Sequence, residues 1–289
     1  MNSQVEMLTF SLEELYSLVS FPGEGGFAKI SDIAYDEVTG KLLVADEGRR
    51  RIYVFRSDGS PERILGTSTD IPAPSMIVPG SGPKLFIIES STGRVFTMSR
   101  EGSEEVVPFS IHGEVTLGEC KAKGMVRGRS GKLYIMGTDG RSLLVCDSGG
   151  RFIRKVESGV NLKDLVSMTV DHRGRVLAAK RGMVGLFLFD ESGEFLREIA
   201  IRDFSTTLAL SEIGGVAVDM SGRIWLSYPM EGFLKVFDET GAHIADVGRE
   251  TIPGGLFSPT DIELTPSGYL MILERGTNSI RCFSVEVAR

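Results

Sequence analysis

Two sets of glycines recur along this chain at matching intervals, and their spacing constrains the fold more than any other feature. Neighbouring members of either set are 42 to 49 residues apart, and each closes a short turn such as HRGR or SDGS. A period of this length, with two tight turns in each unit, is typical of a four-stranded propeller blade. The glycines are Gly40, Gly82, Gly131, Gly174, Gly222 and Gly268 in the first set, and Gly59, Gly102, Gly150, Gly193 and Gly241 in the second.

Each repeat unit reads as four short strands, a to d. In the first unit these are residues 32–36, 41–46, 50–55 and 61–65. Later b strands, such as KLFIIE and RIWLSY, are rich in branched and aromatic residues that favour extended backbone. The c strands, such as GLFLFD, are continuously apolar, which suits sheets covered on both faces by neighbouring blades. The sequence therefore predicts an all-β protein, a six-bladed β-propeller of four-stranded antiparallel blades.

The last unit lacks a fourth strand, because another turn glycine would fall near position 287 and the sequence ends at 289. Before the first unit, the segment ELYSLVSF resembles a d strand. Residues 25–33 (GGFAKISDI) align without gaps with residues 254–262 (GGLFSPTDI). Residues 15–21 are therefore predicted to be strand d of the last blade, which closes the ring and removes open sheet edges. The unbroken repeat predicts one domain over residues 1–289.

Composition excludes several classes of protein. Hydrophobic residues make up 42% and charged residues 25% of the chain, as in ordinary soluble globular proteins. The net charge of -7 disfavours general binding to nucleic acid or to anionic membranes. No apolar run approaches the roughly 20 residues that span a bilayer, and no signal peptide is recognised at the start. We expect a soluble, monomeric, cytoplasmic protein, or a periplasmic or secreted one if a signal peptide has been removed.

Three stretches resemble the NHL repeat: VADEGRRRIYVFRSDG, IWLSYPMEGFLKVFDETG and LMILERGTNSIRCF. Each combines an apolar strand, a basic or polar loop and a second apolar strand, and most carry an acidic residue after the first strand. The resemblance covers nearly the whole chain. It is weaker in the second to fourth units, where the acidic position holds Glu89, Gly137 and Lys180. Membership of the NHL family implies a six-bladed propeller.

The two ends of the predicted blades differ in character. The a–b and c–d turns are short and stereotyped, whereas the b–c loops and d–a crossovers differ from blade to blade. Variable loops on a rigid frame usually carry recognition. An acid at the end of a b strand often bonds its own loop, and we expect this structural role for Asp46 and Glu274. The candidate binding residues on the variable loops are Arg49, Arg50, Glu89, Lys180, Arg181, Tyr228, Met230 and Arg275.

The sequence offers little for catalysis. His112, His172 and His243 lie at stereotyped turns or in a linker, so neither a histidine zinc site nor a Ser-His-acid arrangement is predicted. Other six-bladed propellers with lactonase activity bind a divalent metal through carboxylates and asparagine. The weak candidates here for such a metal, for example Ca²⁺, are Asp32, Glu89 and Asp261. Of the asparagines, only Asn161 and Asn278 lie near variable loops.

Three functional interpretations stay open at this point. The first is a non-catalytic binding scaffold that recognises a protein or peptide through the b–c and d–a loops. The alternative is a metal-dependent hydrolase of the lactonase type. The second alternative is an RNA-binding NHL propeller, which the basic loop residues suggest and the net charge disfavours.

Overall fold

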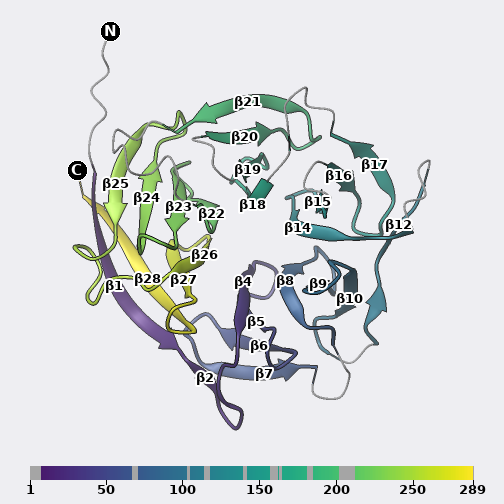
Figure 1. The fold of residues 1–289 in the computed structure, drawn as a ribbon, viewed down its shortest axis with the longest axis horizontal. Coiled ribbons are helices and arrows are strands. Elements are labelled where there is room, and N and C mark those ends of the chain that lie inside the picture. The colour runs from purple at the N-terminus through teal and green to yellow at the C-terminus, as the bar shows by residue number, and fades with distance from the viewer. Residues whose placement is uncertain are drawn as a thin grey trace. The chain divides into compact units, whose positions relative to one another are not determined.

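The computed structural model has an all-β fold. Within its described residues the strands form six four-stranded antiparallel sheets and two two-stranded hairpins (Figure 1). The fold is the predicted six-bladed β-propeller, and the described residues include no helix long and apolar enough to cross a membrane. The chain divides into two compact units. A single domain over residues 1–289 therefore stays a prediction. The structure describes residues 8–66, 71–102, 105–113, 118–138, 142–156, 162, 165–180, 185–201 and 212–288.

The first unit, called the 18–165 unit, comprises Leu18–Leu165 and Asp190–Phe195. Two hairpins accompany its sheets: β2 (Ser20–Phe21) pairs with β3 (Gly25–Gly26), and β12 (Ser110–Ile111) with β13 (Gly118–Glu119). Its described residues form three four-stranded sheets: β4 (Ile30–Asp36), β5 (Lys41–Asp46), β6 (Arg51–Arg56) and β7 (Pro61–Leu65); β8 (Pro74–Pro79), β9 (Lys84–Glu89), β10 (Val95–Ser99) and β11 (Val107–Pro108); and β14 (Ala122–Arg127), β15 (Leu133–Gly137), β16 (Leu143–Cys146) and β17 (Phe152–Lys155).

The second unit, called the 166–289 unit, comprises Met1–Ser17, Val166–Phe189 and Leu196–Arg289. Three of its strands begin or end one residue beyond these ranges. Its described residues also form three four-stranded sheets: β18 (Leu165–Val170), β19 (Val176–Lys180), β20 (Gly185–Phe189) and β21 (Phe195–Ala200); β22 (Val216–Val218), β23 (Ile224–Tyr228), β24 (Phe233–Phe237) and β25 (His243–Val247); and β26 (Pro259–Leu264), β27 (Tyr269–Glu274), β28 (Ser279–Ala288) and β1 (Thr9–Leu18).

The apolar core lies between neighbouring sheets of each unit. In the 18–165 unit, Leu43 and Ile52 of the first sheet pack in one cluster with Ile77 and Leu85 of the second. Because both faces of the middle strands are covered, their apolar residues run consecutively instead of alternating with polar ones. This confirms the prediction made from the continuous apolar c strands.

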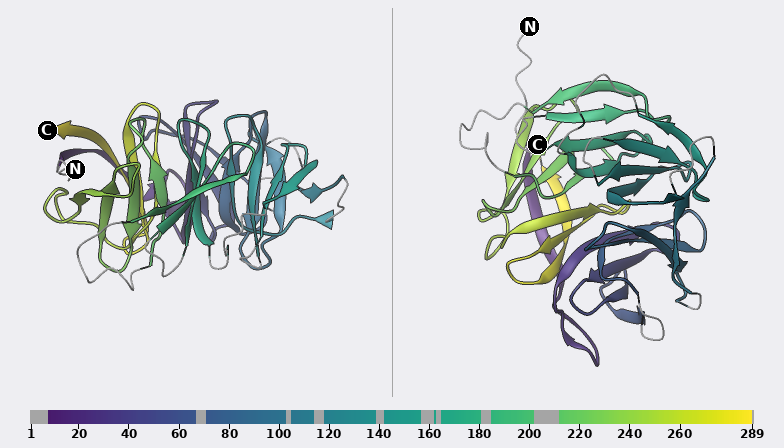
Figure 2. Two further views of the ribbon diagram at one scale, coloured as in Figure 1. Left: turned by 90° about the horizontal axis from the view of Figure 1, so that it is seen from above. Right: turned by 45° about the vertical axis from the view of Figure 1, so that its right-hand side comes forward.

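The N-terminal strand β1 is the fourth strand of the last sheet, beside β28, as predicted (Figure 2). The predicted bounds, 15–21, are wrong. The strand runs over Thr9–Leu18, while Ser20–Phe21 belongs to the β2–β3 hairpin. The strand begins earlier because Phe10 and Leu12 alternate with exposed residues and are buried in the core. Phe10 packs edge-on against Trp225, with ring centroids 5.1 Å apart.

Arg281 on β28 anchors this closing strand. Its Nε and Nη2 donate to Glu14 Oε2 of β1 at 3.1 and 2.6 Å, and its Nη1 donates to the Gly255 carbonyl at 2.8 Å. The guanidinium also lies over the ring of Phe283, 5.0 Å from its centroid. One partly buried cation therefore links β1, β28 and the crossover that precedes β26.

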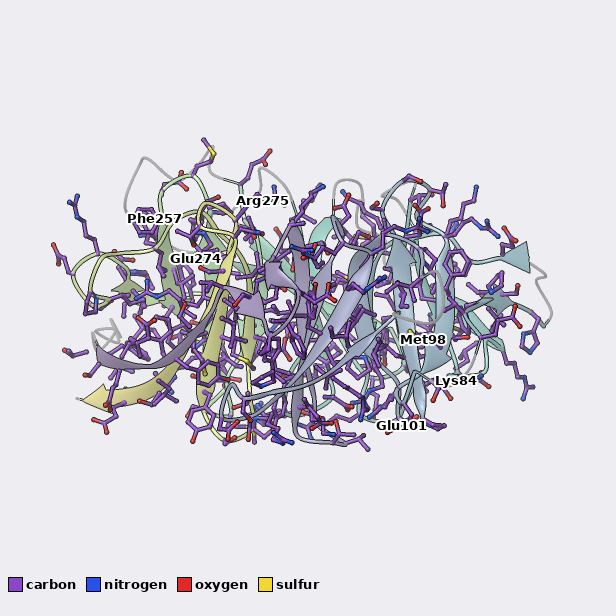
Figure 3. The ribbon with its side chains drawn as sticks, turned by 90° about the horizontal axis from the view of Figure 1, so that it is seen from below. Lys84, Met98, Glu101, Phe257, Glu274 and Arg275 are labelled. Atoms are coloured by element: carbon purple, nitrogen blue, oxygen red, sulfur yellow. The ribbon has the colours of Figure 1, made fainter. Side chains whose placement is uncertain are left out.

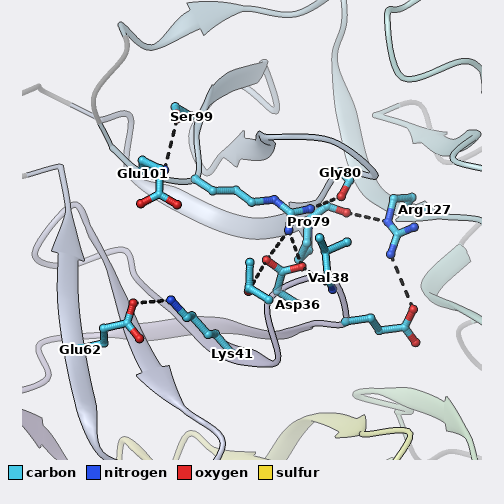
Figure 4. A network of polar contacts seen from close by, with 12 residues as sticks. Asp36, Val38, Lys41, Glu62, Pro79, Gly80, Ser99, Glu101 and Arg127 are labelled. Atoms are coloured by element: carbon cyan, nitrogen blue, oxygen red, sulfur yellow. Dashed lines mark hydrogen bonds and ion pairs between the residues drawn. The ribbon is translucent and has the colours of Figure 1, made fainter.

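A buried ion pair joins the first two sheets of the 18–165 unit (Figure 4). Asp36, at the end of β4, is 2% exposed, and Arg100, just after β10, is 7% exposed. Arg100 Nη1 donates to both carboxylate oxygens of Asp36, at 2.6 Å from Oδ1, and Nη2 donates to the Gly80 carbonyl. The two charges are 64 residues apart in the sequence and satisfy each other away from solvent.

The second glycine set has a packing role that the first largely lacks. Gly241 has a φ of +87°, and a Cβ there would lie 2.2 Å from the Ala200 carbonyl oxygen of the preceding sheet. Gly268 has nearly the same φ, +86°, but a Cβ there would meet no atom within 4 Å. The c–d turn at Gly241 is therefore pressed against its neighbour, and the a–b turn at Gly268 is open.

Gly241→Ala is expected to destabilise the protein more than Gly268→Ala. Both variants carry the strain of a left-handed backbone at a non-glycine residue, about 1–2 kcal/mol. Only Gly241→Ala adds a steric clash, which costs a further 1–3 kcal/mol or so. Denaturant unfolding of both variants measures the difference, and equal losses would show that the turn at Gly241 has room to move.

Candidate functional site

Three segments of the 166–289 unit adjoin at the ends of strands β23 and β27, and we call them the loop surface. They are residues 229–232, 248–258 and 275–278. Gly276 N donates to the Phe257 carbonyl at 3.0 Å, and Arg275 N donates to the Ser258 carbonyl at 3.0 Å. On the other side, a Cβ on Gly232 would lie 2.7 Å from the Leu256 carbonyl oxygen. The crossover 248–258 is therefore held against a b–c loop on each side.

Two large apolar side chains stand out from the loop surface. Met230 is 85% exposed and Phe257 is 54% exposed. Arg275 and Arg249 are also exposed, and neither guanidinium forms a hydrogen bond or ion pair with a described residue. Figure 3 shows Phe257 and Arg275 toward the same end of the strands, with the buried Glu274 below them. The surface thus offers a thioether, an aromatic ring and two guanidinium groups without partners among the described residues.

Glu274 and Asp46 have the structural role expected from the sequence. Glu274 accepts hydrogen bonds from Phe257 N at 3.0 Å and from Thr277 Oγ1 at 3.2 Å. In the 18–165 unit, Asp46 accepts from Ala28 N at 2.8 Å and from Lys29 N at 3.0 Å. Each buried carboxylate thereby fastens a crossover to the end of a b strand, which satisfies backbone donors that loops otherwise leave unpaired.

Glu89, at the end of β9, is occupied by its own loop. Oε1 accepts from Ser91 N at 3.0 Å and from Ser91 Oγ at 2.7 Å. Oε2 accepts from Thr92 N at 2.9 Å and from Thr92 Oγ1 at 2.5 Å. Burial alone would raise the pKa of Glu89, but these hydrogen bonds outweigh it and lower the pKa from 4.5 to about 2. Glu89 is therefore a loop cap held ionised by four donors.

Acid should reveal this role of Glu89. Because its pKa is lower in the folded state, its stabilising contribution is complete above pH 4.5 and is lost as the pH falls toward about 2. Between pH 4.5 and about 2, the free energy of unfolding of Glu89→Gln is expected to fall less than that of the original protein. The check is chemical unfolding from pH 6 downward, with Glu37→Gln as an exposed control. If the free energy of unfolding falls with pH in parallel for all three proteins, Glu89 does not have this role.

Asp32 and Asp261 occupy equivalent positions, one after a β-bulge in β4 and the other after a β-bulge in β26. Asp32 Oδ2 accepts from Ile77 N of the neighbouring sheet at 2.8 Å. Asp261 Oδ1 accepts from Ile262 N at 2.9 Å. The sequence did not predict the bulges, which aim these carboxylates at backbone amides.

Each of the three predicted metal ligands already has a hydrogen-bond donor within its own unit. Glu89 faces its own loop, and Asp32 and Asp261 each bond a backbone amide. Across the described ranges, no group of three or more His, Cys, Asp or Glu side chains is placed to hold a metal ion. Each of these carboxylates already accepts a hydrogen bond, whereas a hard cation needs several converging oxygens. Ca²⁺ binding at these residues stays a prediction.

Two of the five predicted basic residues bond the backbone through their side chains. Arg49 Nη2 donates to the Gly26 carbonyl at 2.7 Å, and Arg50 Nε donates to the Ile71 carbonyl at 3.1 Å. Lys180 ends β19 and is half-buried. Arg181 and Asn161 lie outside the described residues. Of the predicted cations, the structure leaves Arg275 as the exposed group on the loop surface.

Tyr228 differs from its expected place on the variable loops. It is 4% exposed and packs in a core cluster, with its ring centroid 5.5 Å from that of Phe233. Strand β23 extends through residue 228, so the side chain belongs to the strand and not to the loop. Met230, two residues later, lies on the loop surface as predicted.

None of the three histidines belongs to the segments of the loop surface. His243 begins β25 and its Nε2 is 2.8 Å from Asp246 Oδ1. His172 lies in the turn between β18 and β19, and His112 pairs through its backbone with Arg151. Sequence reasoning missed Phe257 and Arg249, because an apolar crossover residue reads as core and a lone arginine in a loop carries no pattern.

Comparisons with known proteins place the fold and leave the family open. No family model matches the chain and no curated protein matches it in sequence, so the NHL resemblance stays a prediction. Virginiamycin B lyase from Staphylococcus aureus is 16% identical with a TM-score of 0.64, over 97% of this chain and 88% of the lyase. A gluconolactonase from Xanthomonas campestris is 13% identical with a TM-score of 0.66, over 99% of this chain and 96% of that one.

A luciferin-regenerating enzyme is also similar, at 9% identity and a TM-score of 0.66, over 96% of this chain and 95% of that one. These three similar structures are described as enzymes. At these identities the likeness establishes the six-bladed fold, which hosts many unrelated activities.

Proposed function

We propose that the protein is a binding propeller that recognises a protein or peptide through the loop surface. The observation that carries this proposal is the grouping of Met230, Phe257 and Arg275 on adjoining loops, exposed and without partners among the described residues. Exposed apolar side chains rimmed by polar ones are a usual mark of a protein interaction site. Aromatic, Met and Arg side chains are also the types enriched in such sites.

The shape of the surface favours a protein or peptide over a small molecule. Small-molecule sites are concave and enclose most of the ligand. Met230 at 85% exposed and Phe257 at 54% exposed project from the surface instead of lining a cavity. A bound protein or peptide could cover these two side chains, which the chain itself leaves exposed.

Selection from a displayed peptide library tests this proposal. Bound peptides are expected to lose affinity about tenfold or more with the double variant Met230→Ala/Phe257→Ala, a change of about 1.4 kcal/mol or more. Met220→Ala is the matched control, because Met220 is 57% exposed in the turn at the opposite end of β23. Failure to enrich any peptide, or equal binding by both variants, would refute the loop surface as the site.

The comparisons support a second candidate, hydrolysis of a lactone or ester. Two of the similar solved structures are described as gluconolactonases, one of them only putatively. The carboxylates that would hold the metal argue against this candidate. Asp32, Glu89 and Asp261 already accept hydrogen bonds from the backbone or from their own loop. The geometry therefore ranks this candidate below binding.

A metal and substrate screen decides between the two candidates. Metal-stripped protein is titrated with Ca²⁺, Mg²⁺, Zn²⁺ and Mn²⁺ while its melting temperature is followed, since an ion that binds only the folded state raises that temperature. The same samples are assayed on a panel of lactones and esters. We expect no saturable shift and no turnover. A shift reversed by chelator, with turnover lost in Asp261→Asn, would replace the binding proposal by the hydrolase.

RNA binding has less support from the described residues. The guanidinium groups of Arg49 and Arg50 donate to backbone carbonyls, so they are not free to neutralise phosphates without breaking those bonds. The net charge of -7 opposes a polyanion as well.

A further inference from the structure

We propose that the loop surface recognises an acidic peptide segment in which a large apolar side chain lies next to one or more carboxylates. This inference rests on the proposed binding function and specifies the chemistry of the partner. It follows from which side chains on the loop surface are unpaired and which are already engaged.

The apolar part of the surface can bury one large side chain of the partner. Met230 and Phe257 lie on segments that adjoin through Gly232 and Leu256, so both can contact the same ligand residue. Methionine adapts its shape to different ligands, and a phenylalanine ring offers a rigid contact face. Together they suit an aromatic or long aliphatic residue.

The charged part of the surface favours carboxylates. Glu274 is held by Phe257 N and Thr277 Oγ1, and Glu231 also has a partner within the chain. Arg249 and Arg275 have no such partner among the described residues, and exposed Glu250 is the carboxylate of the loop surface that also lacks one. Two guanidinium groups and one carboxylate of the loop surface thus lack a partner among the described residues, so the charge that is not already engaged there is mainly cationic, on a chain whose net charge is -7.

Arginine is suited to this recognition because its planar guanidinium donates two parallel hydrogen bonds to a carboxylate. The stem of Arg249 lies along the crossover, with its Cγ 3.7 Å from where a Cβ on Gly255 would stand. Arg275 begins the loop on the other side of the same crossover. One unpaired arginine thus lies in the same crossover as Phe257, and the other begins the loop whose backbone bonds that crossover.

The experiment uses three nine-residue peptides and the full chain. The first peptide carries one Phe flanked by Asp residues, the second replaces Asp by Lys, and the third keeps Asp but replaces Phe by Ser. Fluorescence anisotropy at low and physiological salt measures binding of each. We expect the first to bind most tightly, with affinity that falls as salt rises.

Two charge reversals sharpen the test. Arg275→Glu is expected to weaken the Asp–Phe peptide about tenfold or more and to strengthen the Lys–Phe peptide. Arg129→Glu changes the net charge equally in an exposed turn between β14 and β15, so it should leave both affinities nearly unchanged. Phe257→Ala should weaken the Asp–Phe peptide toward the level of the Asp–Ser peptide. Melting temperatures confirm that each variant is folded.

The outcomes separate this inference from the function on which it rests. Tightest binding by the Lys–Phe peptide, or equal effects of Arg275→Glu and Arg129→Glu, would overturn the acidic partner. In those cases binding sensitive to Met230→Ala/Phe257→Ala would still uphold peptide recognition at the loop surface. If library selection yields no peptide and none of the three binds, both proposals are wrong.

Discussion

A variant that lacks residues 1–18 is expected to lose its cooperative thermal unfolding transition and to aggregate more readily than the full chain. The deletion removes β1, the fourth strand of the last sheet, and exposes the edge of β28. It also takes Phe10 from the ring of Trp225 and leaves Arg281 without Glu14. Calorimetry and light scattering measure the two effects.

A shorter deletion provides the control for the loss of β1. Removing residues 1–8 leaves β1 whole, so this variant should melt like the full chain. Glu14→Gln removes one partly exposed ion pair and should cost only about 1 kcal/mol or less. A cooperative transition at the original temperature in the 1–18 deletion would show that the last sheet is stable with three strands.

Arg100→Ala and Asp36→Ala are each expected to destabilise the protein by about 3–5 kcal/mol, because each leaves an uncompensated charge in the interior. Asp36 and Arg100 are almost fully buried, and Arg100 also donates to the Gly80 carbonyl. Losing either residue should therefore loosen the contact between the first two sheets of the 18–165 unit. Guanidinium unfolding at neutral pH measures the loss of free energy.

Two further variants make this prediction specific. Arg127 and Glu37 form a neighbouring ion pair at 3.7 Å in which Glu37 is exposed, so Glu37→Ala should cost about 1 kcal/mol or less (Figure 4). The double variant Asp36→Leu/Arg100→Met leaves no lone charge and should be more stable than either single alanine variant. If Arg100→Ala costs no more than Glu37→Ala, water reaches the pair and the burial argument fails.

The sequence predicted the strands well where the signal is local. Residues 41–46 and 61–65 were expected as strands and are β5 and β7. Turn glycines and apolar runs act over a few residues, so a repeat of both marks the strands without knowledge of the rest of the fold. The structural role of Asp46 and Glu274 was foreseen because each also bonds the loop that follows it, at Arg49 N and at Thr277 Oγ1. Their bonds to crossovers 17 or 18 residues away in the sequence could not be foreseen in this way.

Features that depend on contacts between residues far apart in the sequence could not be predicted from the sequence. The Asp36–Arg100 pair joins residues 64 positions apart, and nothing in either neighbourhood marks it. Tyr228 was expected on a loop because a strand end cannot be placed to one residue from composition. Phe257 was not singled out, because its exposure depends on the loops that flank the crossover.

The placement of β1 beside β28 has a mechanical consequence. Figure 1 shows the start of β1 and the end of β28 on the same side of this sheet; β1 begins at Thr9 and β28 ends at Ala288. A force that pulls these two strand ends apart therefore loads the hydrogen bonds one after another, as in opening a zipper, instead of loading them all together in shear. Tension applied between the start of β1 and the end of β28 should therefore detach β1 at low force. The same tension applied to β27 and β28 at opposite ends of the pair would load all the hydrogen bonds between these two strands at once.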